Sequence, residues 1–554
     1  MIAVVGLAPG VSAAGGLATL PIATTAPHAT SAPAAASAPG LISDFNNDGF
    51  DDLAIGVPGE TIQGIVNAGA VNVVYGGAAG LSGIGSQFLT QDSPGIGDAS
   101  QEFDLFGDSL ATADFDNDGF ADLAIGAPGE STSIDAIGAI NVLYGSAAGL
   151  TGSGSQFFTQ NSPGVAGTAE AADFFGDALT AGDFDNDGFA DLAVGVPGES
   201  IGSPANAGAV NVQYGSATGL TGSGGQLLTQ NTAAVGSPAE RNDSFGFALA
   251  AGDFDHDGFA DLGVGVPFEA STIRAVGGVN VFYGVAAGLT GSGSQFFTQN
   301  SAGVGSTAAV DESFGYTLTA GDFDNDGFAD LVIGVPFESS SFDAAGGVNV
   351  LYGRAAGLSG SGSQFFTQNS AGVGNAAETN DTFGLGLAVG DFDDDGFADL
   401  AIGVPGEASA IRAVGAANIL YGGAAGLTGT GSQFFTQSTS GAGTGEHDDS
   451  FGYALATGDF NNDGFAELGV GVPFEDVGTA ADAGEVDVLA GSLDGLTTVG
   501  SRSLTQNTAL VPNISEDFDM FGFVLAAGGP DGPTTAQGPT AASAASLWTL
   551  LRRN

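Results

Sequence analysis

Short apolar runs alternate with polar and glycine-rich segments along most of the chain. Between residues 245 and 299, apolar runs occupy 245–251, 262–267, 277–283 and 294–299. The second run reads LGVGVP, and the third reads GGVNVFY. Each run is too short for a typical helix, and the alternating Val positions have the period of a strand. We therefore predict that this stretch forms four antiparallel strands joined by turns.

The same pattern recurs seven times. Each copy contains the acidic motif D-x-[DN]-x-D-G-F-x-[DE]-L, and successive copies begin 68 to 70 residues apart. A four-stranded unit cannot bury both of its faces alone, so neighbouring units have to stack. The motif begins at Asp44, Asp114, Asp183, Asp253, Asp322, Asp391 and Asp459.

A linear solenoid and a closed ring would both stack such repeats, and the ends of the chain distinguish them. The first motif has no Phe-Gly strand before it, whereas the last Phe-Gly strand, 521–527, has no acidic loop after it. The C-terminal region thus supplies the strand that the first repeat lacks. We predict an all-β, seven-bladed β-propeller of four-stranded antiparallel blades, closed by a C-terminal strand that completes the first blade.

Two segments flank the predicted propeller of residues 41–529. Residues 1–40 are uncharged, apolar and then rich in Ala, Pro and Ser, which favours an export signal and linker over a flexible linker alone. We expect residues 530–554 to be a flexible tail. No later stretch has the roughly 18–20 uninterrupted apolar residues of a membrane helix, so we expect no membrane span.

The charge balance restricts the partners. The chain has 63 acidic and 7 basic residues, for a formal charge of −56. This balance argues against nucleic acid and against anionic membranes, since both attract basic surfaces. Because 43% of the residues are hydrophobic, a packed core is still feasible. Divalent cations are the simplest explanation for so many carboxylates.

The acidic loops have the residues that calcium needs. Loop positions 1, 3, 5 and 9 carry side-chain oxygens, position 6 is Gly, and position 7 can add its backbone carbonyl. Turns without metal are the alternative, but they would leave the carboxylates repelling one another. We expect up to seven Ca²⁺ ions rather than Mg²⁺, with weaker sites in the first and last loops. The predicted ligands are Asp44, Asn46, Asp48, Phe50 and Asp52; Asp114, Asp116, Asp118, Phe120 and Asp122; Asp183, Asp185, Asp187, Phe189 and Asp191; Asp253, Asp255, Asp257, Phe259 and Asp261; Asp322, Asp324, Asp326, Phe328 and Asp330; Asp391, Asp393, Asp395, Phe397 and Asp399; and Asp459, Asn461, Asp463, Phe465 and Glu467.

The paired signals F-G-x-x-L-A and D-F-D-N-D-G-F-A-D-L-A-[IV]-G-[VA]-P resemble the FG-GAP repeat of integrin alpha chains and of secreted bacterial proteins. The resemblance covers roughly residues 41–529 and is nearest to the bacterial secreted group. It implies a calcium-binding propeller, secretion or cell-surface location, and often adhesion. Unlike integrin alpha chains, this sequence has the acidic loop in all seven repeats, so integrin signalling is not carried over.

The strand order predicts two faces. The acidic loops lie on one face, and the more variable loops on the other, where we expect an extracellular protein or carbohydrate to bind. Arg241, Arg274 and Arg412 fall in these variable loops, as local charge compensation or as contacts to an acidic partner. A Glu also lies 16 residues after each first Asp, which suggests a structural task, with a ring of binding carboxylates as the alternative: Glu60, Glu130, Glu199, Glu269, Glu338, Glu407 and Glu475.

We expect no enzymatic activity. The chain has three histidines and neither Cys nor Lys. Carboxylate pairs could support glycoside hydrolysis, which is the alternative function, but nearly all acids belong to the repeat. A catalytic site would break the repeat in one place, and the sequence alone reveals no such break.

Overall fold

The computed structural model describes residues 43–203, 205–270, 274–339, 342–408, 413–441 and 443–529, together with the backbone of strand β29 at Gly532–Ala536. The expected export segment, residues 1–40, lies outside the described residues. So does most of the expected tail, residues 530–554, and Arg412.

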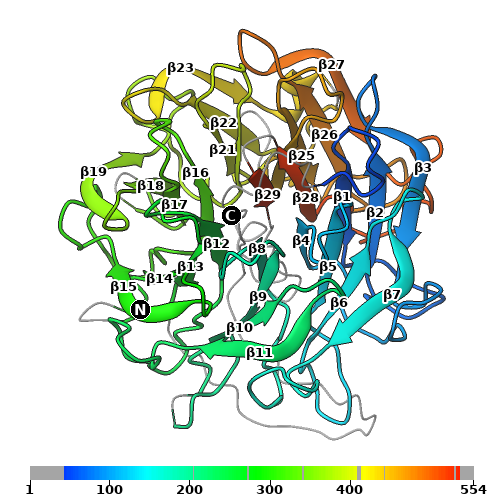
Figure 1. The fold of residues 1–554 in the computed structure, drawn as a ribbon. Coiled ribbons are helices and arrows are strands. Elements are labelled where there is room, and N and C mark those ends of the chain that lie inside the picture. Colours follow the sequence, from blue (N-terminus) through cyan, green and yellow to red (C-terminus); the bar gives the residue numbers. More distant parts are fainter. Residues whose placement is uncertain are drawn as a thin grey trace, which may run out of the picture.

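Seven antiparallel sheets stand around a central axis (Figure 1), which confirms the predicted seven-bladed propeller. Each blade has four successive strands, A to D, from the axis outward. The A strands of blades 1 to 7 are β28 (Val524–Gly529), β4 (Ser109–Ala113), β8 (Leu179–Gly182), β12 (Leu249–Gly252), β16 (Thr317–Gly321), β20 (Leu387–Gly390) and β24 (Leu455–Gly458). The B strands are β1 (Leu53–Val57), β5 (Asp122–Ala127), β9 (Asp191–Val196), β13 (Asp261–Val266), β17 (Asp330–Val335), β21 (Asp399–Val404) and β25 (Glu467–Val472).

The C and D strands complete the blades, in the same order. The C strands are β2 (Ala70–Tyr75), β6 (Ala139–Tyr144), β10 (Ala209–Tyr214), β14 (Gly278–Tyr283), β18 (Gly347–Tyr352), β22 (Ala416–Tyr421) and β26 (Glu485–Ala490). The D strands are β3 (Ser82–Leu89), β7 (Thr151–Phe158), β11 (Thr221–Leu228), β15 (Thr290–Phe297), β19 (Ser359–Phe366), β23 (Thr428–Phe435) and β27 (Thr497–Leu504). The described part of the chain has one short helix, α1 (Gln437–Ser440), between β23 and β24.

The ring closes through the C-terminal region, as predicted. Strand β28 pairs with β1, so that Ile55 lies opposite Leu525. In Figure 1 the red β28 accordingly lies beside the blue β1. Strand β29 pairs with the other edge of β28 and makes this sheet five-stranded.

Strand boundaries differ from the prediction at both edges of a blade. The A strand of blade 4 begins at Leu249 rather than at Phe245, because Phe245 instead bridges to Gly208 of the preceding blade. Gly208 has a φ of +84°, and a Cβ there would lie 2.2 Å from the Phe245 carbonyl oxygen, so only glycine fits. The D strand begins at Thr290, within the segment expected to be a turn, because Thr290 pairs with Tyr283 beyond a bulge.

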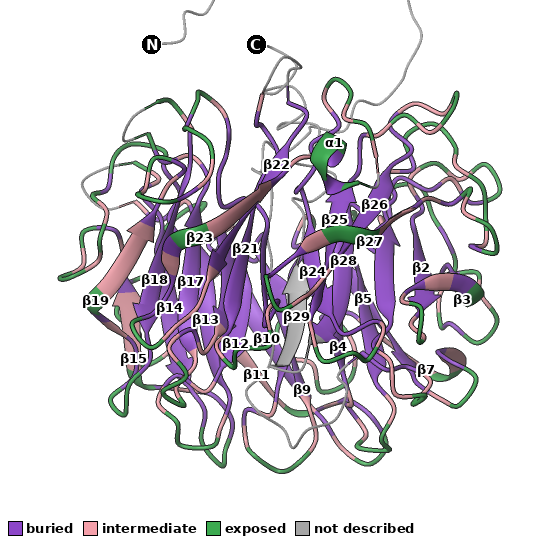
Figure 2. Ribbon diagram, turned by 90° about the horizontal axis from the view of Figure 1, so that it is seen from above, coloured by how far each residue is buried: buried purple, intermediate pink, exposed green. Residues whose placement is uncertain are grey.

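The core lies between neighbouring blades. In the cluster joining blades 7 and 1, for example, Leu53 and Ile55 of β1 pack with Phe460, Val486 and their neighbours. Strands A to C are almost entirely buried, whereas the D strands form the half-exposed outer rim (Figure 2). Burying each sheet against the next is what the repeat requires, and it leaves the connecting loops exposed at the two ends of the ring.

Candidate metal centres

The acidic loop joins strand A to strand B, and loop 2 illustrates its backbone. Asp114 at position 1 accepts hydrogen bonds from the N–H groups of Asp118 (3.1 Å) and Gly119 (2.9 Å). Position 4, Asn117 here, has a φ of +54°, and the other six loops have a positive φ there as well. Asn and Asp tolerate this left-handed conformation better than most residues, which explains their preference at a position without a predicted ligand.

Position 9 anchors the loop to the start of strand B. Asp122 is fully buried and accepts hydrogen bonds from the N–H groups of Phe115 (2.8 Å) and Gly145 (2.9 Å). Burial raises its pKa to about 8, because a charged carboxylate is poorly solvated there. A bound cation would favour the ionised form.

The fold brings positions 1, 3 and 9 together. In loops 2 to 5, one carboxylate oxygen from each of these positions lies within 4.8 Å of the others. Position 3 contributes an Oδ1 atom that is shielded from solvent and has no hydrogen-bond partner in six of the seven loops. These atoms belong to Asn46, Asp116, Asp185, Asp255, Asp324 and Asp393. A buried oxygen without a donor is costly unless a cation or water satisfies it, so the residues fit a metal ion.

Positions 5 and 7 are joined by a hydrogen bond of their own. Asp118 is exposed, and its Oδ1 accepts the N–H of Phe120 at 3.0 Å. The same contact recurs in all seven loops, at 3.0–3.2 Å. The predicted ligands at positions 1, 3 and 9 therefore converge, while the carboxylate at position 5 orders the turn.

Loop 7 differs from the others at position 3. Asn461 donates its Nδ2 to Oε1 of Glu467 at position 9, at 2.8 Å. In loop 2, by comparison, both oxygens of the position 9 carboxylate accept backbone N–H groups of the same blade. The position 3 side chain of loop 7 is therefore hydrogen-bonded within its loop, unlike the position 3 oxygens of the other six loops.

The loops are bonded to one another in a circle. The N–H of position 8 donates to the position 1 carbonyl of the preceding loop at 2.9–3.3 Å at all seven junctions. At the closing junction this residue is Asp51, a buried carboxylate that also accepts the N–H of Asp459 at 2.9 Å. The Asn117 side chain likewise reaches Gly188 of the next loop, at 2.9 Å. Where position 4 is His256, the exposed imidazole lies against Phe328 of the next loop.

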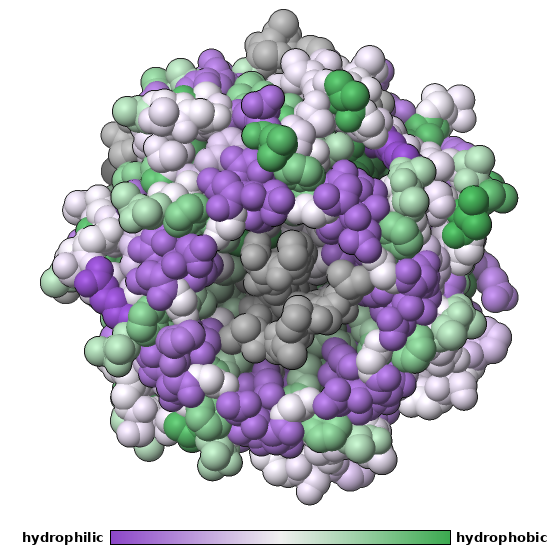
Figure 3. All heavy atoms as spheres, turned by 45° about the horizontal axis from the view of Figure 1, so that its top comes forward, coloured by the Kyte–Doolittle hydropathy of each residue, from purple (hydrophilic) through white to green (hydrophobic). Residues whose placement is uncertain are grey.

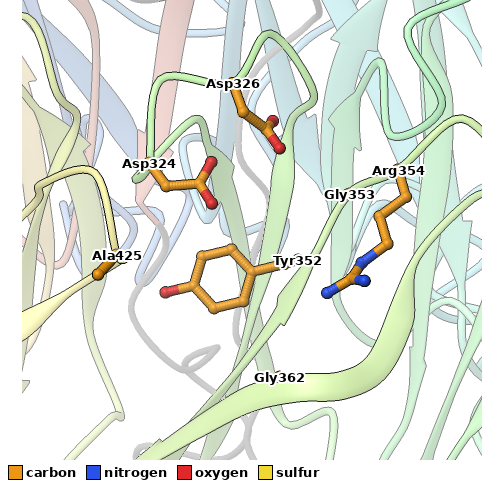
Figure 4. A pocket seen from close by; sticks show the side chains of 7 residues that line it. All are labelled: Asp324, Asp326, Tyr352, Gly353, Arg354, Gly362 and Ala425. Atoms are coloured by element: carbon orange, nitrogen blue, oxygen red, sulfur yellow. The ribbon is translucent and has the colours of Figure 1, made fainter.

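One arginine breaks the repeat on this face. Arg354, in the loop after β18, lines an open pocket of about 370 Å³ with Asp324 and Asp326. Figure 4 shows both carboxylates and the guanidinium group pointing into this space. The guanidinium donates to the Ser361 carbonyl at 2.7 Å. Sequence reasoning missed this arrangement, because Arg354 is 28 to 30 residues from the carboxylates.

The repeated Glu is held by the blade before it. Each accepts a hydrogen bond from the Gln that follows the preceding D strand, at 2.5–2.9 Å. The expected structural task is therefore present, but the donor is a side-chain amide of another blade. The closing contact joins Gln506 to Glu60, 446 residues apart. Burial raises the pKa of six of these carboxyls, for instance that of Glu199 to about 7.

A second joint links neighbouring blades at the end of strand C. In blade 2 the Tyr144 hydroxyl donates to Gln156 Oε1 at 2.5 Å, and the Gln156 amide donates to the Leu220 carbonyl of blade 3 at 3.0 Å. In blade 7 Ala490 stands in place of the Tyr, and Arg502 in place of the Gln. Arg502 donates to the Leu81 carbonyl of blade 1 at 2.7 Å.

Three buried acids depart from the repeat, and the sequence alone did not identify them as departures. Asp108 and Asp177 are the third residues of two Phe-Gly segments and are both buried. Burial, followed by the charge of Asp108, raises the pKa of Asp177. Asp487 of blade 7 replaces the buried Asn of the six other C strands, and burial and Glu485 raise its pKa to about 9.

Two of the three arginines singled out in the variable loops are described. Arg274 forms an ion pair with Asp311, which is local charge compensation. Arg241 is exposed, and Arg412 lies outside the described residues. Among the described helices none is long and apolar enough to cross a membrane.

The fold and the repeated loops define a seven-bladed propeller with acidic A–B hairpins. The FG-GAP repeat family matches residues 35–74, 106–143, 175–212, 245–280, 314–351, 383–421 and 451–489. The chain therefore belongs to the FG-GAP repeat proteins.

The proteins similar to this chain include an integrin alpha chain and a phospholipase D. Integrin alpha-8 of Homo sapiens is 28% identical over 305 residues, 53% of this chain and 25% of that protein. Phosphatidylinositol-glycan-specific phospholipase D of Rattus norvegicus is 36% identical over 159 residues, 28% of this chain and 18% of that protein. The chain thus spans a quarter or less of these relatives. A rhamnogalacturonan lyase of Bacillus licheniformis covers 88% of this chain and is itself covered to 94%, but at a TM-score of 0.31 and 10% identity, a likeness too weak to support an argument.

Proposed function

We propose that the acidic loops bind calcium, up to one ion in each of the seven loops, through the residues predicted at positions 1, 3, 5, 7 and 9. The observation that carries this proposal is the solvent-shielded, unpartnered oxygen at position 3 beside the carboxylates of positions 1 and 9. Oxygen donors of mixed type suit Ca²⁺, which accepts six to eight ligands in irregular arrangements. The ion would neutralise carboxylates that otherwise repel one another.

The test is to count bound ions in purified protein. Equilibrium dialysis against Ca²⁺ followed by metal analysis gives the stoichiometry, and Asp116→Ala removes the position 3 ligand of loop 2, whose Oδ1 has no hydrogen-bond partner. We expect one ion fewer in this variant. The variant Asp135→Asn removes an exposed carboxylate of the same blade outside the loop and should retain every ion. Protein that retains no Ca²⁺ would refute the proposal.

We further propose that the propeller is an extracellular binding or adhesion module, secreted or held at the cell surface, with residues 1–40 serving in export and residues 530–554 as a tail. Integrin alpha chains use FG-GAP propellers as adhesion modules. Ligand contact is assigned to the face of the B–C and D–A loops, at the top of Figure 2, where α1 lies. The exposed large apolar side chains support this choice, because most of them lie in those loops: Val66, Phe103, Val310, Phe342, Leu510, Ile514 and Phe518.

The opposite end has a different character. Its A–B loops are charged, and in Figure 3 hydrophilic residues gather in separate patches around the centre of the face shown, as a polar set repeated in each blade would. Apolar side chains on exposed loops are typical of protein-binding surfaces, and aromatic ones also stack on sugars. A carbohydrate array and a panel of extracellular matrix proteins, probed with and without Ca²⁺, test the assignment. Binding abolished by Phe103→Ser with Phe518→Ser supports it, and binding that survives both changes contradicts it.

A glycoside hydrolase remains the alternative function, and one observation favours it. Asp108 and Asp177 form the unrepeated carboxylate pair that the sequence alone did not reveal. Paired carboxyl groups are the machinery of glycoside hydrolysis. Turnover of a polysaccharide panel that Asp177→Asn abolishes would establish this alternative and defeat the binding-module proposal.

A further inference from the structure

The face opposite the acidic loops contains a second group of acids, clearest where the ring closes. Glu60 comes from the B–C loop of blade 1, whereas Glu516 and Asp519 come from the connection between β27 and β28. One carboxylate oxygen of each lies within 4.8 Å of the others. Glu60 and Asp519 are only 2% and 1% exposed, whereas Glu516 is exposed. The group is thus a buried carboxylate pair with a third acid at its mouth.

A neutral oxygen accompanies this group. The Gln506 amide donates its Nε2 to Glu60 at 2.7 Å, which places the carbonyl end of the same amide beside the acids. Its Oε1 is buried and has no hydrogen-bond partner, although Gln506 is only 1% exposed. Buried amide oxygens are normally satisfied, so an absent partner requires a cation or water. The same unpartnered Oε1 occurs at every junction, in Gln91, Gln160, Gln230, Gln299, Gln368, Gln437 and Gln506.

Four other junctions have the same three acids. In each, the N–H of the exposed Glu donates to the buried Asp three residues later, as it does between Glu516 and Asp519. At two of these junctions Oδ1 of the buried Asp is also unpartnered, in Asp173 and Asp381. The four sets are Glu199 with Glu170 and Asp173, Glu269 with Glu240 and Asp243, Glu407 with Glu378 and Asp381, and Glu475 with Glu446 and Asp449.

Two junctions depart from this composition and serve as internal references. Between blades 1 and 2, Gln101 replaces the exposed Glu and donates its amide to Glu130 at 2.7 Å. Between blades 4 and 5, Ala309 takes that place, and Glu312 replaces the Asp. Asp98 lies close to Glu130 and Asp104 at the first of these junctions, whereas Ala309 contributes no carboxylate at the second.

Three carboxylates meet at the closing junction, where the side-chain amides of Gln506 and Asn513 both donate to Oε2 of Glu60, at 2.7 and 2.8 Å. No described Arg forms an ion pair with these acids, and the sequence has no Lys. We propose that the closing junction, and the four junctions that share its acids, bind a divalent cation of the size and hardness of Ca²⁺ in a second ring, on the face opposite the A–B loops. The exposed Glu at each mouth captures the ion, and the buried Glu, Asp and Gln oxygens hold it between two blades.

The sharpest test locates the ions directly. Crystals of the unmodified protein grown with Ca²⁺ and soaked with Tb³⁺ should show anomalous peaks between Glu60, Glu516 and Asp519. Peaks confined to the A–B loops would overturn the inference. Peaks at the junctions but not in the A–B loops would instead refute the proposed function alone, so the two failures are distinguishable.

A binding measurement complements the map. The variant Glu516→Gln with Asp519→Asn should lose one Ca²⁺ in equilibrium dialysis, while Glu102→Gln, an exposed Glu of the equivalent connection after β3, should lose none. Because Asp519 is buried, Glu516→Gln alone serves as a second variant, and it should weaken that site at least several-fold. An unchanged ion count and an unchanged affinity in Glu516→Gln would contradict the inference.

Discussion

Blades 2 and 7 have the same strands but different joints. Blade 2 follows the repeat, with Asp116 and Asp122 in its acidic loop, Asn141 in strand C, and the Tyr144–Gln156 pair at its outer joint. Blade 7 changes each of these features and has to bind blade 1, where the ring closes. The comparison indicates that the fold needs the contacts of the repeat, not its particular side chains, and that substitutions accumulate at the closing blade.

Removing calcium is expected to have the largest effect, and to act through loops like that of blade 2. A ligand held only by the folded state adds about 2.7 kcal/mol per site at about 100 times its dissociation constant. We expect excess EDTA to lower the melting temperature markedly, because the unpartnered oxygens and buried carboxylates lose their cation. Circular dichroism melts with EDTA and with Ca²⁺ restored measure this. Coincident melts would show that the loops do not hold metal.

The second largest effect on stability is expected at the joint between blades 7 and 1, where the ring closes. We expect Arg502→Ala to destabilise the protein by about 1.5–3 kcal/mol, since a charged donor to the Leu81 carbonyl is lost. Gln156→Ala removes the corresponding neutral contact in blade 2 and should cost about 1 kcal/mol. Denaturant unfolding compares the two.

A repaired joint serves as the control for this comparison. Arg502 lies beside Gly80, as Tyr144 lies beside Gly219 in the equivalent place. Ala490→Tyr combined with Arg502→Gln should therefore recreate the joint of blade 2 and recover most of the stability. A variant of Arg502→Ala as stable as the original protein would show that closure does not depend on this contact.

Restoring the Asn of the other blades at Asp487 should stabilise blade 7 in a pH-dependent manner. Burial, followed by Glu485, raises the pKa of Asp487 from 3.8 to about 9, so the folded protein retains a proton that the unfolded chain has lost. The stability of the original protein therefore falls as pH rises through this window. Asp487→Asn should be nearly neutral near pH 4 and stabilising by about 1–3 kcal/mol near pH 9.

Melting temperatures across this pH range test the expectation. The exposed Asp494 of the same blade provides the matched control, and Asp494→Asn should show no such slope. The oxygen of the new Asn can still accept the Ser440 hydroxyl, which donates to Asp487 at 2.8 Å. A constant difference between Asp487→Asn and the original protein at all pH values would contradict the assignment.

The smallest effect is expected in the acidic loop of blade 7. Asn461→Asp with Glu467→Asp gives this loop the ligand set of blade 2 and removes the amide contact to position 9. Because ligand charge tunes calcium affinity, we expect the weakest site to tighten by about an order of magnitude, with little change in stability. Isothermal titration with Ca²⁺ measures this change. Equal affinities before and after the substitutions would show that positions 3 and 9 do not make the loop of blade 7 a weaker site.

The sequence by itself determined the number of blades, the four strands in each, the closure by a C-terminal strand, and the acidic loops. These features are local and periodic: nine residues of one hairpin contain a whole loop, and alternation identifies each strand. Strand edges were less predictable, because Phe245 and Thr290 are placed by neighbours outside their own runs.

Only the tertiary structure decided what joins the blades. Gln91 meets Glu130 across 39 residues, Gln506 meets Glu60 across 446, and Asp108 approaches Asp177 from a different blade. No spacing within one repeat reveals such a contact, because its members belong to different repeats, and only the closing of the ring brings them together. Acids at equivalent positions of the repeat thus lie in different environments, and burial and neighbouring charges set their pKa values.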